Sequence, residues 1–336
     1  MKIIVDGFGG DNAPAEVIKG ARLAADEYGA EILLAGNEAR LRDTAASLGV
    51  SLDGIEIINA DDMITMEDAP TDVVRAKKNS SMAVGLQALN DGRGDAFVSA
   101  GNTGALVVGS RTIIHCLEGM RRAALAPILP SDTGCYMLLD AGANAECRPD
   151  MLLKFGYMGS IYMEKIMHIK NPRVGLVNIG TEKSKGTDLQ REAYKLLSAS
   201  NLNFVGNVEG RDIPFGVCDV VIADGFTGNI ILKLTEGLGL AFGGNVKKIF
   251  RRSILTKLAA LLVSSGIKDF KDKMDYSEYG GAPLMGISKP VIKAHGSSNA
   301  TAYKNAIRQA IAFVTEDVNT AIAQSLPMGN DGVGAE

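Results

Sequence analysis

The chain has 336 residues, of which 46% are hydrophobic and 22% charged, and its net charge is −4. This length can bury a large core, as one big domain or two closely packed halves, and the composition is that of an ordinary globular protein. The net negative charge argues against a nucleic-acid-binding protein that works by bulk electrostatic attraction. Four cysteines without C-x-x-C spacing, and only three histidines, argue against structural zinc and favour reduced thiols in a cytosolic protein.

We expect neither a secretion signal nor a membrane span in this sequence. A strand pattern begins at Lys2, without the apolar core of a signal peptide. No apolar run approaches the ~20 residues that a membrane-spanning helix needs. We therefore expect a cytoplasmic protein that is soluble or peripheral to a membrane.

The first third of the chain alternates strand and helix signals. Residues 2–5 form a strand pattern, and a glycine-rich turn over 6–14 leads to a helix with apolar Val17, Ile18 and Ala21. Further strands are expected at 31–35, 55–58 and 95–98, and helices at 38–48 and 81–90. This β-α-β alternation is typical of a mostly parallel sheet covered by helices on both faces.

The remaining two thirds continue the alternation. Strands are expected at 137–140, 173–177, 203–205 and 219–222, and helices at 151–168, 189–197, 237–252 and 300–324. Residues 328–336 have the composition of a frayed tail.

Five of the predicted strands end in glycine-containing turns. The turns cover residues 6–14, 99–105, 141–144, 178–186 and 224–229. Ligands of doubly wound sheets bind beyond the carboxyl ends of the strands. The pattern therefore predicts five turns on one side of one sheet, around one ligand site.

Two of these turns resemble each other. The segment from Asp219 to Ile230 repeats the Asp, Gly, Thr and Gly positions of the segment from Asp95 to Leu106. A helix that begins at such a turn directs unpaired N–H groups and its dipole at an anion. Our hypothesis is that both turns line one anion-binding cleft. The alternative is that strand–glycine–helix turns recur in any α/β protein.

Two basic segments can each be interpreted as a binding surface or as an ordinary structural element. Arg75, Lys77 and Lys78 precede a serine-capped helix, which suits contact with phosphate or phosphopantetheine or a solvated surface. From 247 to 273, eight cations surround the apolar stretch from Ile254 to Val263. That arrangement favours an anionic membrane surface, a helical partner or an acidic protein, and the alternative is a core helix or a dimer seam.

Several familiar catalytic motifs are missing. Asn12 stands where a G-x-G-x-x-G motif needs its third glycine, and neither a Walker sequence nor G-x-S-x-G occurs. The strand-end turns offer hydrogen-bond donors and cations without a covalent nucleophile and its base. Such a site suits a reaction whose nucleophile is itself an anion, such as phosphate beside an electrophilic carbonyl. Two alternatives are a metal-dependent decarboxylating dehydrogenase on a similar fold and a membrane-associated scaffold.

Taken together, the motifs at 6–14, 77–82, 99–106, 139–144, 206–212, 224–233, 279–282 and 292–298 resemble the bacterial phosphate acyltransferases of phospholipid synthesis. The resemblance covers nearly the whole chain in order. The chain departs from it at Gly7, Phe8 and Asn12, where the family more often has Ala, Met and His. A catalytic role for position 12 is therefore not carried over.

The resemblance implies a three-layer α/β/α sandwich with a mostly parallel sheet, related to phosphotransacetylase and isopropylmalate dehydrogenase-like folds. It implies one domain over 1–327, with a protruding helical tip at about 243–278 and a flexible tail at 328–336. The implied reaction moves a fatty acyl group from acyl carrier protein to inorganic phosphate, without a cofactor or metal. The acyl phosphate then serves a glycerol-3-phosphate acyltransferase, and the enzyme is a homodimer held at the inner face of the membrane.

The turns and the resemblance together give candidate site residues. Lys185 or Lys293 supplies charge to phosphate, Asn229 or Asn102 binds the developing oxyanion, and His295 either protonates the leaving thiolate or caps its loop. The expected substrate-binding residues are Asp6, Gly9, Gly10, Asp11, Ser99, Gly101, Asn102, Thr103, Gly104, Asn144, Asp224, Gly225, Thr227, Gly228 and Ser297. The expected contacts with membrane or carrier protein are Arg251, Arg252, Leu255, Leu258, Leu261 and Leu262.

Overall fold

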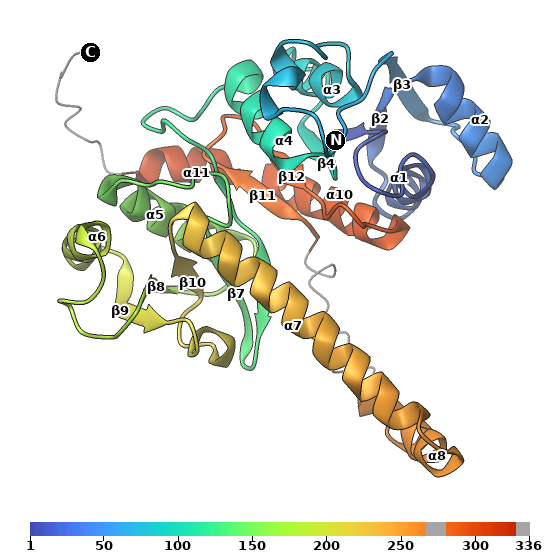
Figure 1. Ribbon diagram of the computed structural model, residues 1–336. Coiled ribbons are helices and arrows are strands. Elements are labelled where there is room, and N and C mark those ends of the chain that lie inside the picture. The colour runs from blue at the N-terminus through green and yellow to red at the C-terminus, as the bar shows by residue number, and fades with distance from the viewer. Residues whose placement is uncertain (267–279, 327–336) are drawn as a thin grey trace.

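Seven strands form a first sheet in the order β3-β2-β1-β4-β12-β11-β5. Five of them run parallel: β1 (Lys2–Asp6), β2 (Glu31–Gly36), β3 (Ile55–Asn59), β4 (Ala96–Ser99) and β12 (Val291–Lys293). The antiparallel edge consists of β11 (Ala282–Met285) and β5 (Ala124–Leu125). Figure 1 shows this computed structural model, which describes residues 1–266 and 280–326.

Helices cover both faces of the first sheet because successive strand residues point to opposite sides. Ile3 and Val5 pack against α1 (Ala15–Tyr28) and α10 (Ala300–Thr315), whereas Ile4 packs against α3 (Ser81–Asn90) and α4 (Thr103–Gly109). Helix α2 (Glu38–Leu48) links β2 to β3. Short helical turns occupy Pro70–Val74 and Ser110–Ile114.

Five further strands form a second sheet in the order β6-β7-β10-β8-β9. The parallel strands are β7 (Gly134–Leu139), β10 (Val220–Ile222), β8 (Arg173–Asn178) and β9 (Asn203–Glu209), and β6 (Ile128–Ser131) is antiparallel. Helices α5 (Pro149–Lys165) and α6 (Asp188–Ser198) pack on one face, and Leu232 of α7 (Gly225–Arg251) packs on the other. A short helical turn, Ile213–Phe215, precedes β10.

The two sheets are joined by direct hydrogen bonds. The Ala141 N–H, after β7, donates to the Leu125 carbonyl of β5 over 2.9 Å. Between α10 and α5, the Gln309 amide donates to the Tyr162 hydroxyl over 2.7 Å. Helix α11 (Val318–Ser325) also packs against α5, so one apolar cluster runs beneath both sheets.

The predicted fold class, three layers of helices and mostly parallel strands with a protruding helical tip, is confirmed. The expectation that all five turns lie on one sheet is wrong. The turns after β1 and β4 belong to the first sheet, and those after β7, β8 and β10 belong to the second. The reason is non-local pairing. The chain crosses to the second sheet between β5 and β6, and near its end it returns to the first sheet, where β12 pairs with β4.

Two helix predictions also need correction. Helix α7 begins at Gly225, well before the expected start, because the Asp224 carboxylate caps it by accepting the Thr227 N–H over 2.9 Å. The closing helix is two helices, α10 and α11, which separate at Asp317, where the backbone is left-handed with φ of 47°. The four short strands β5, β6, β11 and β12 were not expected from the sequence.

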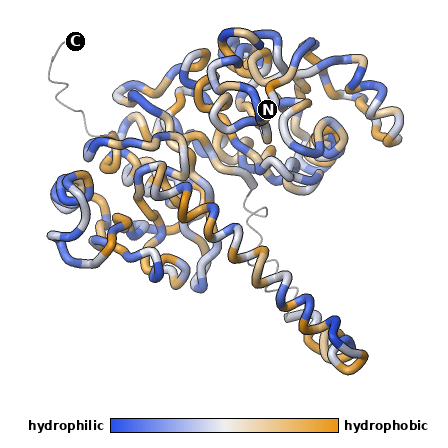
Figure 2. The backbone as a smooth tube through the Cα atoms, in the orientation of Figure 1, coloured by the Kyte–Doolittle hydropathy of each residue, from blue (hydrophilic) through white to orange (hydrophobic). Residues whose placement is uncertain are grey.

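Helix α7 leaves the body of the protein and ends beside α8 (Ile254–Leu262), as Figure 1 shows. Its 27 residues span about 40 Å at the rise of an α-helix. Figure 2 shows apolar and polar residues alternating along this projection. Of the predicted tip, residues 243–266 lie in or just after these helices, while 267–278 and the predicted tail at 328–336 lie outside the described residues. No described helix is long and apolar enough to cross a membrane.

Candidate active site

Three polar residues meet at the carboxyl edge of the first sheet. Strands β1, β4 and β12 are parallel neighbours, with Val5 opposite Val98 and Lys293 opposite Ser99. Asp6, Ser99 and Lys293 are therefore the last residues of three adjacent strands, at the same edge of the sheet. The sequence analysis selected all three, but it did not place Lys293 on a strand.

The Asp6 carboxylate anchors this edge. It is buried and accepts hydrogen bonds from the hydroxyls of Ser81, over 2.6 Å, and Ser99, over 2.7 Å. Burial raises the pKa of Asp6, and these hydrogen bonds oppose the shift. The Ser99 hydroxyl also accepts the Gly101 N–H over 3.0 Å. Asp6 and Ser99, both predicted to bind substrate, thus hold the two turns together.

The turn after β1 packs closely on its neighbours. A side chain at Gly9 would place its Cβ 2.5 Å from the Asp6 carboxylate, so only glycine fits there. The Tyr303 hydroxyl of α10 donates to the Gly9 carbonyl over 2.5 Å, and the Asp11 N–H donates to the Gly296 carbonyl over 2.8 Å. Asn12, where the sequence departs from the resembled family, donates its amide to the Ser297 carbonyl over 3.2 Å. The first turn therefore holds the loop after β12 in place.

Lys293 places a buried cation at this edge. Its side chain is mostly enclosed, the residue being 8% exposed, and its ammonium donates to the carbonyls of Ala100, over 3.2 Å, and Ala294. Burial, and secondarily the charge of Lys233, lowers the pKa of Lys293 to about 8, although Asp6 and Asp11 oppose the shift. A cation with neutral partners keeps an unneutralised charge for an anion.

The His295 ring is oriented by its own loop. Its Nδ1 accepts the Ser297 N–H over 3.2 Å and lies 2.8 Å from the Ser297 hydroxyl. Burial lowers the pKa of His295, and Glu236 opposes that shift. A lowered pKa favours the neutral ring, and because Nδ1 accepts the Ser297 N–H, the proton of that neutral form is assigned to Nε2. Nε2 faces the Glu236 carboxylate, 3.9 Å away.

Glu236 belongs to α7, so the second sheet completes the site. Its carboxylate pairs with Lys233 of the same helix over 2.8 Å. The sequence analysis missed both residues. A signal in the sequence could have identified them, because Asn229, Lys233 and Glu236 follow helical spacing and share one face of α7. The expected helix began at residue 237, so that face was not considered.

Asp140 is a second anchor that the sequence analysis did not select. It is buried at the end of β7, and its carboxylate accepts the N–H groups of Leu125, Gly142, Ala143 and Asn144 and the Asn144 side-chain amide, at 2.7–3.1 Å. Burial raises its pKa against these bonds. The Asn144 amide also donates to the Ala123 carbonyl over 2.7 Å. Asn144 was predicted to bind substrate, but its donors are used to fix this turn.

The N-terminus of α7 is likewise occupied. The N–H groups of Gly225, Thr227 and Gly228 donate to the Asn144 carbonyl, the Asp224 carboxylate and the Asp224 carbonyl, at 2.8–2.9 Å. A Cβ at Gly228 would lie 1.9 Å from the Asp140 carbonyl oxygen. These residues and Asp224 were predicted to cradle phosphate. In this structure the three N–H groups seat α7 against the Asp140 turn, and the role of these residues in binding phosphate stays a prediction.

At the other turn, Asn102 caps α4. Its side-chain oxygen accepts the Ala105 N–H over 3.0 Å, and its amide donates to the carbonyls of Thr65, over 3.3 Å, and Asp68, over 3.4 Å. The side chain therefore has a structural role in this structure, and its role on an oxyanion stays a prediction. The first-turn N–H groups of Thr103 and Gly104 have no intrahelical acceptor, as at any helix N-terminus.

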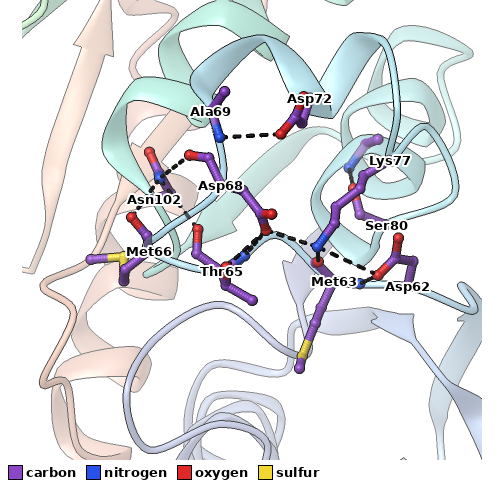
Figure 3. A network of polar contacts seen from close by, with 11 residues as sticks. Asp62, Met63, Thr65, Met66, Asp68, Ala69, Asp72, Lys77, Ser80 and Asn102 are labelled. Carbon is purple, nitrogen blue, oxygen red and sulfur yellow. Dashed lines mark hydrogen bonds and ion pairs between the residues drawn. The ribbon is translucent and has the colours of Figure 1, made fainter.

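The loop that Asn102 holds is fixed from its other side by Lys77 (Figure 3). The Lys77 ammonium donates to the Asp68 carboxylate over 2.8 Å and to the Met63 carbonyl over 3.0 Å. The hydrogen bond from Lys77 is the largest cause that lowers the pKa of Asp68 to about 2. Lys77 thus braces a loop, whereas Arg75 and Lys78 are exposed.

Comparison with known proteins identifies the family. A family model described as "Fatty acid synthesis protein" matches residues 1–321. The chain belongs to this family. "Phosphate acyltransferase" of Alkaliphilus oremlandii is 48% identical, over 98% of this chain and 99% of that protein. The same-named protein of Thermoanaerobacterium thermosaccharolyticum is 48% identical over 100% and 99%.

Solved structures with low identity share the fold. A phosphotransacetylase from Streptococcus pyogenes is 20% identical and covers 94% of both chains with a TM-score of 0.66. A 4-hydroxythreonine-4-phosphate dehydrogenase from Salmonella typhimurium is 14% identical, with a TM-score of 0.52 over 93% of this chain and 98% of that one. Family membership confirms the predicted enzyme class: the chain is an acyltransferase of lipid synthesis. The dehydrogenase and scaffold alternatives are not supported by it.

Lys185 and Asn229 lie at the edge of the second sheet. The Lys185 ammonium is half exposed and lies 3.9 Å from Glu182 in the loop after β8. Asn178 holds that loop by donating its amide to the Lys185 carbonyl over 3.1 Å. The Asn229 side chain lies beside Gly142. Neither residue contacts Lys293 or His295 in the parts of the chain that the structure describes, so their catalytic roles stay predictions.

The six residues expected to contact membrane or carrier protein lie at the end of the projection. Arg251 and Arg252 are exposed, as are the four leucines, with Leu255 at 78% and Leu262 at 85%. This exposure excludes a core helix within residues 1–266 and 280–326. A membrane, a carrier protein or a second copy of the chain remain as partners.

Proposed function

We propose that this acyltransferase moves a fatty acyl group from the thioester of acyl carrier protein to inorganic phosphate and releases an acyl phosphate. Relatives named phosphate acyltransferase support phosphate as the acceptor. The observation that carries the site assignment is the buried Lys293 ammonium, which donates to neutral carbonyls next to His295. A mostly buried cation without a bonded carboxylate favours a bound anion, because its charge is weakly screened there.

In this proposal Lys293 holds phosphate while a phosphate oxygen attacks the thioester carbon. The new C–O bond forms, negative charge develops on the carbonyl oxygen, and the C–S bond then breaks. The Nε2–H of His295 stabilises the departing sulfur by a hydrogen bond. The thiolate then takes up the proton that the hydrogen phosphate nucleophile loses. Asn229, or Lys185, contributes to the charge that develops on oxygen. Catalysis is mainly positioning and charge stabilisation.

We further propose that the tip associates with the inner face of the membrane and that the enzyme is a cytoplasmic homodimer. Exposed leucines flanked by arginines suit an anionic bilayer, and the same cations suit an acidic carrier protein. A peripheral position would deliver the acyl phosphate to a glycerol-3-phosphate acyltransferase. The exposed apolar face of α7 supports pairing with a second copy.

One assay tests the reaction. The enzyme is incubated with acyl-acyl carrier protein and phosphate, free thiol is measured, and acyl phosphate is trapped with hydroxylamine. Equal amounts of thiol and acyl phosphate are expected, and neither should form when phosphate is omitted. Thiol release without acyl phosphate would instead indicate a hydrolase and contradict the proposal.

Single substitutions test the assigned residues. Lys185→Ala and Asn229→Ala should each lower turnover, by about 10²-fold if the group stabilises the transition-state charge. Lys183→Ala, in the same loop as Lys185, is the matched control and should leave turnover near wild type. Near-normal turnover in either test variant removes that residue from the scheme.

A further inference from the structure

We propose that Lys233 binds the phosphate acceptor together with Lys293. Glu236 forms an ion pair with the Lys233 ammonium until phosphate displaces the Glu236 carboxylate. The inference rests on the proposed function and deepens it. It assigns the acceptor to both halves of the molecule, with one cation from β12 and one from α7.

The first support is placement. Lys233 and Glu236 lie on α7, which follows β10 of the second sheet, whereas Lys293 and His295 belong to β12 and its loop in the first sheet. Glu236 bridges the two halves: one carboxylate oxygen lies 2.8 Å from the Lys233 ammonium and the other 3.9 Å from His295 Nε2. Lys233 therefore stands within one helical turn of the residue that reaches the loop of Lys293.

The second support is charge. Lys293 forms no ion pair with a carboxylate within the described ranges, and Lys233 is among the charges that act on it. The Asp6 carboxylate, which also acts on Lys293, is held by two serine hydroxyls. Two cations that act on each other repel, and an anion bound between them relieves the repulsion. Phosphate carries up to two negative charges near neutral pH and meets this need.

The third support is that phosphate can replace the Glu236 carboxylate at the Lys233 ammonium. The Lys233 side chain is 58% exposed, so phosphate can reach its ammonium from solvent. Glu236 is 16% exposed and brings one negative charge to the same ammonium. When phosphate takes its place, the carboxylate remains beside His295 Nε2–H and keeps that ring oriented. Lys233 thus binds substrate, and Glu236 acts as a positioning residue.

Steady-state kinetics with phosphate as the varied substrate test the pair. Lys233→Ala should raise the KM for phosphate about 10- to 100-fold, the range for losing a charge-assisted hydrogen bond, with a smaller effect on kcat. Lys233→Arg should recover part of the loss. The matched control is Lys195→Ala, because Lys195 forms a comparable pair with Glu192 on α6, at 2.7 Å, and should leave the KM unchanged.

Glu236→Gln gives an effect of opposite sign. Removing the competing carboxylate should lower the KM for phosphate several-fold, and this gain should disappear in the Lys233→Ala background. An unchanged KM in Lys233→Ala, or a raised KM in Glu236→Gln, overturns the inference while leaving the proposed reaction intact. If the wild-type enzyme forms no acyl phosphate at all, the proposed function itself fails.

Discussion

At the scale of single residues, the hydrogen-bond partners of a buried charged group distinguish groups that hold the structure from groups that face a ligand. Asp6 and Asp140 are buried carboxylates whose oxygens are filled by serine hydroxyls or backbone N–H groups. Each such bond to a charged acceptor contributes about 1.5–3 kcal/mol, so these anchors fix the turns firmly. Lys293 is also buried but is bonded to neutral carbonyls, so its charge remains for a substrate.

The lowered pKa of Lys293 gives a pH prediction. Its ammonium is present below a pKa of about 8 and is lost above it. The KM for phosphate dianion should therefore be flat below pH 8 and rise above it, approaching tenfold per pH unit. Initial rates measured from pH 6.5 to 9.5 would show this rise.

Lys293→Arg is the control for that profile, because a guanidinium stays charged throughout this range. The rise should disappear in this variant, whatever its absolute activity. A rise that persists would mean that a group other than Lys293 causes it.

At the scale of elements, α7 connects the site to the periphery. Its first turn is seated on the Asp140 turn, its next two turns supply Lys233 and Glu236, and its far end leads to α8. One stripe of its surface, Leu234, Leu238, Phe242 and Ile249, is exposed and apolar. The helix therefore has one face for chemistry and another that no residue of 1–266 or 280–326 covers.

Helix α8 gives a prediction about membranes. Leu258→Glu combined with Leu261→Glu should abolish sedimentation with phosphatidylglycerol vesicles, since each leucine that enters the bilayer contributes up to about 1.5–3 kcal/mol. Activity on acyl-acyl carrier protein in solution should persist.

The uncharged pair Leu258→Gln and Leu261→Gln separates burial from charge. It should also weaken sedimentation, because the apolar area is lost without added repulsion. If both double variants sediment like wild type, α8 contacts a carrier protein or a second copy of the chain instead.

At the scale of the whole molecule, the site lies where the two sheets meet. Lys293 and His295 come from one half, and Lys233 and Glu236 come from the other. The crossing segment between β5 and β6 and the hydrogen bonds to Asp140 fix the halves relative to each other. A small change in the position of one half relative to the other would alter the distance between the ammonium groups of Lys233 and Lys293.

The apolar stripe on α7 gives a prediction about assembly. The wild-type enzyme should sediment as a dimer, and Leu238→Arg combined with Phe242→Arg should give monomers. Guanidinium groups buried without partners in an apolar interface cost several kcal/mol. Sedimentation equilibrium measures the mass, and circular dichroism shows that the variant is folded. A variant that remains dimeric would place the interface elsewhere.

The sequence by itself determined the local structure. Apolar periodicity and glycine turns predicted most strands and helices and the carboxyl-edge turns. The turns and the family resemblance together gave Lys293 and His295 as candidate site residues. These features depend on neighbours in the chain, whose spacing is visible in the sequence. The start of α7 was missed because Asp224, which caps it, was read as a ligand residue.

Only the tertiary structure decided which residues meet. The division into two sheets depends on β12 pairing with β4, nearly two hundred residues away along the chain. The same long-range packing buries Lys293, brings Glu236 to His295, and gives the side chains of Asn102 and Asn144 hydrogen bonds to backbone carbonyls of other loops. Pairing between distant segments leaves no periodic signal in one sequence. The tertiary structure was therefore needed to show which side chains of the two halves lie together.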